Sequence, residues 1–313
     1  MRKSSRFGVQ RIVLLFMAAM PLFELILHRP CLVVIAAVLV LFVLEERADS
    51  AGHQPSDGRI ATNFVLYSLG LGMIGSIGVI LPGLFAAPTA ALLPGFGLSS
   101  WLVLPAWASW LALFLVDSFI NYWLHRLSHS LPWLWRIHRV HHSDPAVDVS
   151  TTLRSHPLEL LPNYLGQLAA IAVVGATPLQ ALGVALVNGV WALFAHADLR
   201  RTALDFPPLL RVLVSPAYHR VHHSALSAQA DSNYATMLTL WDHVFATARV
   251  PQREQIAEIG LGPGYAGALT LRGQLALPLC SMGLNGALVR PPAIRLTRRH
   301  PEAAPDPGSP GGL

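Results

Sequence analysis

Long runs of apolar residues with almost no charge limit what this chain can fold into more than any other feature. Of its 313 residues, 53% are hydrophobic and 12% are charged, whereas a soluble domain usually has about 25% charged residues. A run of about 20 apolar residues is long enough to cross a bilayer as a helix. Residues 60–81 and 101–120 form two such runs. We therefore predict an all-α integral membrane protein.

Three other apolar runs are shorter or interrupted. Runs 12–27 and 31–44 are separated by a His-Arg-Pro tripeptide, which favours a tight helical hairpin. A cleaved signal peptide is the alternative for the first run, but no small-residue cleavage site follows it. Run 158–195 is interrupted near its middle by Gly175 and Pro178, so we expect a re-entrant segment or a short hairpin that returns to the same side.

The distribution of basic residues predicts the orientation in the membrane. Lys and Arg lie before the first run, in residues 45–59 and among the histidines, and they are absent from residues 82–100. By the positive-inside rule, both termini and the histidine-rich segments face the cytosol if the first two runs act as a pair. The net charge of +5 fits this role, and its pattern does not indicate nucleic-acid binding. The two cysteines provide no disulfide framework.

Three histidine boxes stand out against this apolar background. The string HRVHH occurs at His138–His142 and again at His219–His223, and HRLSH occurs at His125–His129. Residues three and four apart share a face of a helix, so each box is expected to aim two or three imidazoles in one direction. Because Pro132 lies between the first two boxes, we expect them on separate helices that meet at an angle.

This density of histidines predicts metal binding. Neutral imidazole suits iron, zinc, copper and nickel. The boxes hold eight of the fourteen histidines, more than the four ligands of a tetrahedral zinc site, so two ions divide them sensibly. The boxes lack cysteine, and the zinc-protease string HExxH is absent. The isolated histidines are interpreted as interfacial or packed residues: His28, His53, His243 and His300.

The boxes and their flanking residues resemble the fatty acid hydroxylase / sterol desaturase superfamily. They are similar to its HxxxH, HxxHH and HxxHH boxes, and the strings RIHRVHHSDPAVDVSTTLRSHPLE, SPAYHRVHHS and DSNYATMLTLWDHVFATA are family-like. The resemblance covers about residues 110–248. The chain departs from the family in NYAT, where glycine is common after the tyrosine, and in FATA, where FGT is common. These positions lie outside the boxes.

The resemblance implies an integral membrane enzyme with a non-haem di-metal centre. It implies that the box histidines are the ligands, and two further histidines are candidates. His196 ends run 158–195 where family members also place a histidine, and an interfacial role is its alternative. His156 lies in the string TTLRSHPLE, and its alternative is a supporting role with Arg154 and Glu159. The implied and candidate metal ligands are His125, His129, His138, His141, His142, His156, His196, His219, His222 and His223.

Two polar residues are expected to assist catalysis. Asp117 lies at membrane depth four residues before Asn121, which lies four before His125. Placing a carboxylate in the membrane costs free energy, so Asp117 is a functional candidate. It could accept a hydrogen bond from a ligand imidazole. A simple position at the interface is the alternative. Asn233 is the second, as an outer partner of the ligands. Asp144 and Asp242 are further candidates for that role, with loop capping as the alternative for all three.

We therefore expect a polytopic helical bundle with a cytosolic helical cap that carries the di-metal site. Its expected regions are residues 1–100 as an N-terminal transmembrane region, 101–250 as the catalytic domain, and 251–313 as a surface segment and disordered tail. The resemblance implies a di-iron centre, for which zinc can substitute in purified samples. It would use O2 to hydroxylate or desaturate a lipid C–H bond.

Electrons must come from outside, because the chain has no recognisable haem domain. A cytochrome, ferredoxin or flavoprotein reductase is implied as the donor. An ether-lipid or carotenoid-modifying oxygenase with the same centre is one alternative. A membrane metal-binding or transport protein is the non-enzymatic alternative, which predicts more polar residues along several spans.

Overall fold

The computed structural model of the chain describes residues 30–47, 57–80, 97–199, 209, 211–249, 259–261 and 270–279. Regular structure in these ranges is helical, with two isolated β-bridges. The predicted helix over run 12–27 and the predicted tail lie outside the described residues. Run 31–44 forms α2 (Pro30–Arg47), and run 60–81 forms α3 (Asp57–Ile80), as the sequence predicts.

The helix that carries the first histidine box is longer than predicted. After the short α6 (Leu98–Trp101), α7 runs over Ala106–Ser130, so it begins five residues later than the apolar run 101–120 and extends through HRLSH. The residue before a proline is disfavoured in a helix, and proline is favoured at the first helical position. Accordingly α7 stops before Pro132, and α8 (Pro132–His142) begins there. The prediction of separate helices for the first two boxes is confirmed.

The interrupted run 158–195 folds as a helical hairpin. The short η2 (Pro157–Glu159) leads into α9 (Leu160–Val174), which ends at Gly175 in the left-handed conformation, with φ 72°. Thr177 caps α10 (Pro178–His196) in a capping box with Gln180. Gly166 allows the close approach of α9 to α7, because a Cβ there would lie 2.5 Å from a Leu124 methyl carbon. The hairpin prediction is confirmed.

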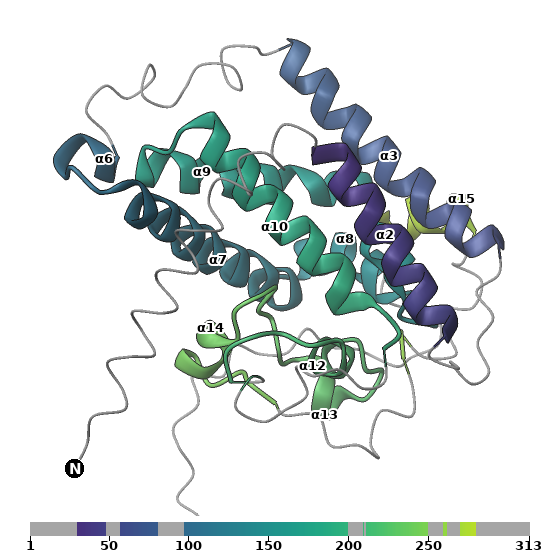
Figure 1. The fold of residues 1–313 in the computed structure, drawn as a ribbon. Coiled ribbons are helices and arrows are strands. Elements are labelled where there is room, and N and C mark those ends of the chain that lie inside the picture. The colour runs from purple at the N-terminus through teal and green to yellow at the C-terminus, as the bar shows by residue number, and fades with distance from the viewer. Residues whose placement is uncertain are drawn as a thin grey trace, which may run out of the picture.

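These elements form a bundle with a cap at one end. Helices α7, α9 and α10 pack around buried aliphatic residues, and α2 packs beside α10 (Figure 1). The cap comprises α8, η1 (Val149–Leu153), α12 (Pro216–His222), α13 (Ser227–Ala230) and α14 (Leu240–Val244). In Figure 1, α12, α13 and α14 lie below the C-terminal ends of α7 and α10.

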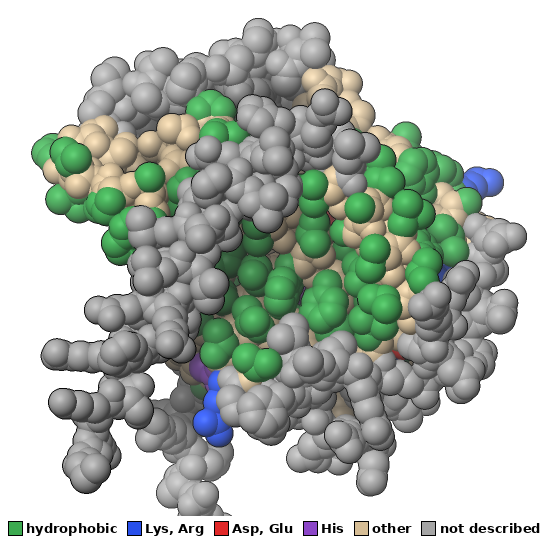
Figure 2. Space-filling view, viewed as in Figure 1, with side chains coloured by type: hydrophobic (Ala, Val, Ile, Leu, Met, Phe, Trp, Pro, Cys, Tyr) green, Lys and Arg blue, Asp and Glu red, His purple; other side chains and the backbone are tan. Residues whose placement is uncertain are grey.

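The outer faces of the bundle are apolar. Figure 2 shows hydrophobic side chains gathered over α2 and α10. Large exposed apolar residues occur on α2, α3, α7, α9 and α10, among them Leu39, Phe64 and Leu182. Two segments of the described chain, Pro157–Val174 and Pro178–His196, are long and apolar enough to cross a membrane.

Part of the predicted surface segment 251–313 is described, at residues 270–279. Its described part, α15 (Leu271–Ala276) and η5 (Leu277–Leu279), packs against α3 and α8. Gln274 is fully buried and accepts a hydrogen bond from Ser143 Oγ at 3.0 Å. Arg139 on α8 donates to the carbonyl oxygen of Leu277. These polar contacts with the end of the second histidine box hold the segment on the cap.

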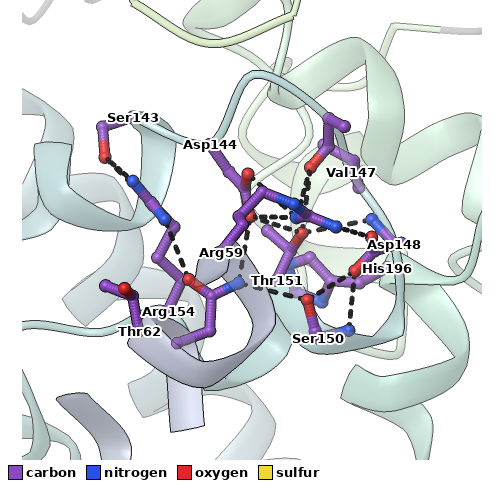
Figure 3. Close-up of polar contacts among 12 residues, drawn as sticks. Arg59, Thr62, Ser143, Asp144, Val147, Asp148, Ser150, Thr151, Arg154 and His196 are labelled. Atoms are coloured by element: carbon purple, nitrogen blue, oxygen red, sulfur yellow. Dashed lines mark hydrogen bonds and ion pairs between the residues drawn. The ribbon is translucent and has the colours of Figure 1, made fainter. Parts of the chain in front are cut away.

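A buried polar network ties α3 to the chain that follows the second box (Figure 3). Arg59 Nη1 contacts Asp144 Oδ2 at 2.8 Å, and its Nη2 pairs with Asp148. Asn63 donates to Asp144 at 3.3 Å and accepts from Arg154 Nη1 at 2.8 Å. The Asp144 side chain is 0% exposed and that of Arg59 is 9% exposed. This network fixes the loop between α8 and η1.

We predict that Arg59→Met destabilises the protein markedly. Removing one partner of a buried ion pair leaves an uncompensated charge, which costs about 3–5 kcal/mol. The matched control is Asp198→Asn, which breaks a partly exposed pair with Arg220, and such pairs contribute about 0–1 kcal/mol. Thermal unfolding of the purified protein in detergent measures both. Equal melting temperatures for the two variants would contradict the role of the network.

Candidate metal centre

Nine histidines meet where the bundle joins the cap, and all but His125 are buried. They form two groups, and within each group the ligand nitrogens all lie within 4.8 Å of one another. The five-histidine group draws on α7, α8 and α12, and the four-histidine group draws on α8, α10 and α12. The five-histidine group is His125, His129, His138, His142 and His222; the four-histidine group is His141, His196, His219 and His223.

Each HRVHH box contributes to both groups. In the first HRVHH, the first and last histidines join the five-histidine group, and the middle histidine joins the four-histidine group. In the second HRVHH the assignment is reversed. This differs from the expectation that each box points in one direction. Residues i+3 and i+4 lie on opposite sides of residue i, about 100° apart around the helix axis. One HRVHH box can therefore supply ligands to two neighbouring metal positions.

The tautomers in the four-histidine group follow from their backbone contacts. His141 Nδ1 lies 3.1 Å from the Arg154 carbonyl oxygen, and His196 Nδ1 lies 2.8 Å from that of Ala192. A carbonyl only accepts, so both Nδ1 atoms carry the proton and both Nε2 atoms present a lone pair. These Nε2 atoms lie 3.1 Å apart. Burial lowers the pKa of His141 well below its ordinary value, as do neighbouring histidines, which disfavours a shared proton. The pair therefore fits a bound cation.

The five-histidine group has the same arrangement. His125 Nδ1 donates to the Tyr234 carbonyl at 2.7 Å, and His222 Nδ1 donates to the Ser232 carbonyl at 2.8 Å. The Nε2 atoms of His125, His129 and His222 are buried without a hydrogen-bond partner in the described part of the chain. Burial lowers the pKa of His222 to about 3, so this imidazole is neutral at physiological pH. The unpartnered Nε2 atoms of these three histidines therefore lie close together, as the ligands of one metal ion would.

The spacing of the nitrogens also suits metal ions. Neighbouring Nε2 atoms within the groups lie 3.0–3.2 Å apart. Imidazole nitrogens bind zinc at about 2.0–2.1 Å, and two such ligands at a right angle are separated by about 3.0 Å. Donors of this kind suit iron, zinc, copper and nickel. The nine histidines therefore fit two cations.

Asp242 organises the loop that supplies two of these carbonyls. It is fully buried in α14 and accepts four hydrogen bonds. Burial raises its pKa, and these donors oppose that rise. Because Ser232 and Tyr234 belong to the same loop, Asp242 holds the acceptors for His222 and His125. The donors are Tyr234 N at 2.9 Å, Ala235 N at 3.0 Å, Thr247 Oγ1 at 2.7 Å and Tyr218 Oη at 3.2 Å.

The structure places Asn233 beside the site rather than in either histidine group. Its φ of 57° is in the left-handed region, which asparagine tolerates better than most residues. Its side-chain amide donates to the carbonyls of Tyr218 and Arg249, each at 2.9 Å, and accepts from Arg249 N at 2.6 Å. Asn233 thereby closes the loop that Asp242 organises.

Asp117 and His156 also lie outside both groups. Asp117 Oδ2 accepts from the side-chain amides of Asn121 at 2.8 Å and Asn188 at 2.6 Å, and the second bond links α7 to α10. His156 is buried, and its Nδ1 accepts from Leu158 N at 3.2 Å at the start of η2. His196, in contrast, joins the four-histidine group.

Glu159 has a contact that the sequence did not predict. Its Oε1 lies 2.5 Å from His138 Nδ1. The sequence pairs Glu159 with its close neighbour His156, whereas the fold brings η2 back against α8 and pairs it with a box histidine. The carbonyl partners of the other imidazoles were also missed, since any residue can supply a backbone carbonyl.

Comparison with known proteins supports the reading of the boxes. Residues 110–247 match the model of the fatty acid hydroxylase family. The chain is 34% identical over 142 residues to an alkylglycerol monooxygenase from Danio rerio, covering 45% of this chain and 30% of the relative. It is 32% identical over 181 residues to the ornithine lipid hydroxylase OlsE from Rhizobium tropici, covering 56% and 52%. A methylsterol monooxygenase from Arabidopsis thaliana is 28% identical over 144 residues, covering 43% and 45%.

These matches establish the family of the histidine-bearing region. Residues 110–247 belong to the fatty acid hydroxylase / sterol desaturase superfamily. The matched part spans between about a third and half of the length of these three relatives. No solved structure matches the chain.

We predict that Asp242→Asn lowers metal retention. The asparagine amide places a donor where four donors converge, so the loop carrying Ser232 and Tyr234 shifts and loosens His222 and His125. Loss of such outer partners typically costs about 10–100-fold in metal affinity. Metal content after dialysis against a chelator measures the effect, with His243→Ala as the control, because His243 is exposed and belongs to neither group. Retention equal to that of the control would contradict this role of Asp242.

Proposed function

We propose that the protein is a membrane oxidoreductase that uses O2 and external electrons to hydroxylate or desaturate a lipid C–H bond. The observation that carries this proposal is the convergence of nine imidazoles in two adjoining groups within a family of lipid oxygenases and hydroxylases. We assign the box histidines and His196 as ligands of two metal ions, and we expect iron in the cell. When bound, the two ions supply the O2 activation that side chains alone cannot provide.

The protein residues prepare this centre. Burial lowers the pKa of imidazoles in both groups, among them His125, His141 and His222, and metal binding requires the neutral form. The carbonyls of Ser232, Tyr234, Arg154 and Ala192 fix the tautomers and direct the Nε2 lone pairs inward. The enclosed position excludes bulk water, which protects the reaction from side processes.

We further propose that the bundle lies in the membrane with the cap on the cytosolic side. The support is the apolar outer face of α2, α3, α7, α9 and α10, together with the basic residues near the boxes. The boxes would then lie at the membrane surface, where a lipid can approach laterally. We place Asp117 and Asn233 as positioning residues: Asp117 joins α7 to α10, which contribute His125 and His196, and Asn233 closes the loop beside His222.

We infer an electron donor outside the described part of the chain, such as a cytochrome, ferredoxin or flavoprotein. Oxygenation of an ether lipid is the second candidate reaction, favoured by the similarity to alkylglycerol monooxygenases from several animals. Lipid profiling of cells with and without the gene distinguishes the candidates. An accumulating ether lipid supports the second, and an accumulating unhydroxylated or saturated lipid supports the first.

We predict that His222→Ala loses metal and turnover together. The variant removes a buried imidazole whose Nε2 faces the five-histidine group. Metal analysis and O2 consumption coupled to lipid oxidation measure the two effects. His243→Ala is the matched control, because His243 is exposed and belongs to neither group. Near-normal iron content and turnover in His222→Ala would overturn the proposed function.

A further inference from the structure

The two histidine groups differ in the chemical groups that contact the Nδ1 atoms of their imidazoles, on the side of each ring away from the metal position. In the four-histidine group, His141 and His196 donate to neutral backbone carbonyls. The Nδ1 atoms of His219 and His223 are buried and have no hydrogen-bond partner in the described ranges. Asp148 acts on His196 only through space, and it is ion-paired with Arg59. The imidazoles of this group therefore have no carboxylate hydrogen-bonded behind them among the described residues.

In the five-histidine group, two carboxylates lie behind the imidazoles. Glu159 Oε1 is 2.5 Å from His138 Nδ1, and the Glu159 side chain is 11% exposed. Its second oxygen, Oε2, is buried without a hydrogen-bond partner among the described residues. Asp231 Oδ1 lies 3.8 Å from His129 Nδ1 and is one-third exposed, so its effect is more strongly screened by solvent. The charge that supports this group comes mainly from Glu159.

The position of Glu159 is set by the local fold. Pro157 starts η2, and Glu159 is the last residue of this single turn before α9 begins. The turn packs against α3 and α8, which brings the carboxylate to the imidazole of His138. The backbone of Glu159 is thus fixed by η2, which it ends, and by α9, which begins at the next residue.

We propose that Glu159 is a positioning residue that makes the two metal positions unequal, so that the five-histidine group holds its ion more tightly than the four-histidine group. A carboxylate that accepts the Nδ1 proton of a ligand histidine fixes the ring and makes its Nε2 a stronger donor. The five-histidine group also has one more potential ligand than the other group, which likewise favours tighter binding of its ion. This inference rests on the proposed two-metal centre and adds to it which of the two ions is bound more tightly.

The test is stepwise metal removal from the full-length protein in detergent, loaded with Co²⁺ alone as the probe. Ions per chain are counted by elemental analysis as a chelator is added. We expect the wild-type protein to release its ions in two steps, with a plateau at one ion. His223→Ala, which breaks the four-histidine group, is expected to keep the tightly held ion and lose the other.

Glu159→Gln is expected to weaken the tightly held ion by about 10–100-fold and to leave the loosely held ion unchanged. His243→Ala is the control and should release both ions as the wild type does, because His243 is exposed and belongs to neither group. Release of both wild-type ions in one step, or loss of the tight ion in His223→Ala, would overturn the inference. So would a Glu159→Gln effect confined to the loose ion.

The outcomes separate this inference from the proposed function. A wild-type protein that binds no Co²⁺ contradicts the two-metal centre itself. A protein that binds two ions with equal affinity keeps the centre and contradicts only the inequality. If Glu159→Gln does not fold, as judged by circular dichroism, the release steps of the wild type and of His223→Ala still decide the order of affinity.

Discussion

Repulsion between buried lone pairs is the constraint on which the rest of this site depends. Imidazoles whose Nδ1 protons are committed to carbonyls must direct unprotonated Nε2 atoms toward one another, as His141 and His196 do at 3.1 Å. Such an arrangement is unfavourable without a cation, and protonation is disfavoured by burial. The fold therefore stores a local cost that a bound metal would remove. Metal binding and stability of the cap should be linked for this reason.

The helices and loops around the site are held in place by local contacts that oppose the repulsion between these nitrogens. Prolines begin α8, α10 and α12, which sets the direction of each helix at its first turn. The Arg59 network anchors the loop after α8, and Asp242 anchors the loop after α12. Each anchor uses a buried carboxylate that receives several donors. These anchors fix the loops next to α8 and α12, the helices that carry the two HRVHH boxes.

Much of the helical architecture could be predicted because it depends on local chemistry. Pro132 separates α7 from α8, and Gly175 with Pro178 divides the hairpin of α9 and α10. The histidine boxes were found from spacing alone. Other features could not be predicted, because they join distant residues. The segment over residues 270–279 packs on the chain at and just after α8 through Gln274 and Leu277, in contacts between residues 131 and 138 positions apart.

The sequence by itself determined which residues offer imidazoles and where the helices that carry them begin and end. Spacing of three and four residues and single prolines act within one or two turns, so they can be read along the chain. Only the tertiary structure decided how nine imidazoles divide into five and four, and which atom stands behind each ring. Those outcomes depend on the packing of α7, α8, α10 and α12 and on contacts such as that of Glu159 with His138, 21 residues apart. Helical periodicity brings HRVHH to one side of a helix, and the neighbouring helices set which group each imidazole joins.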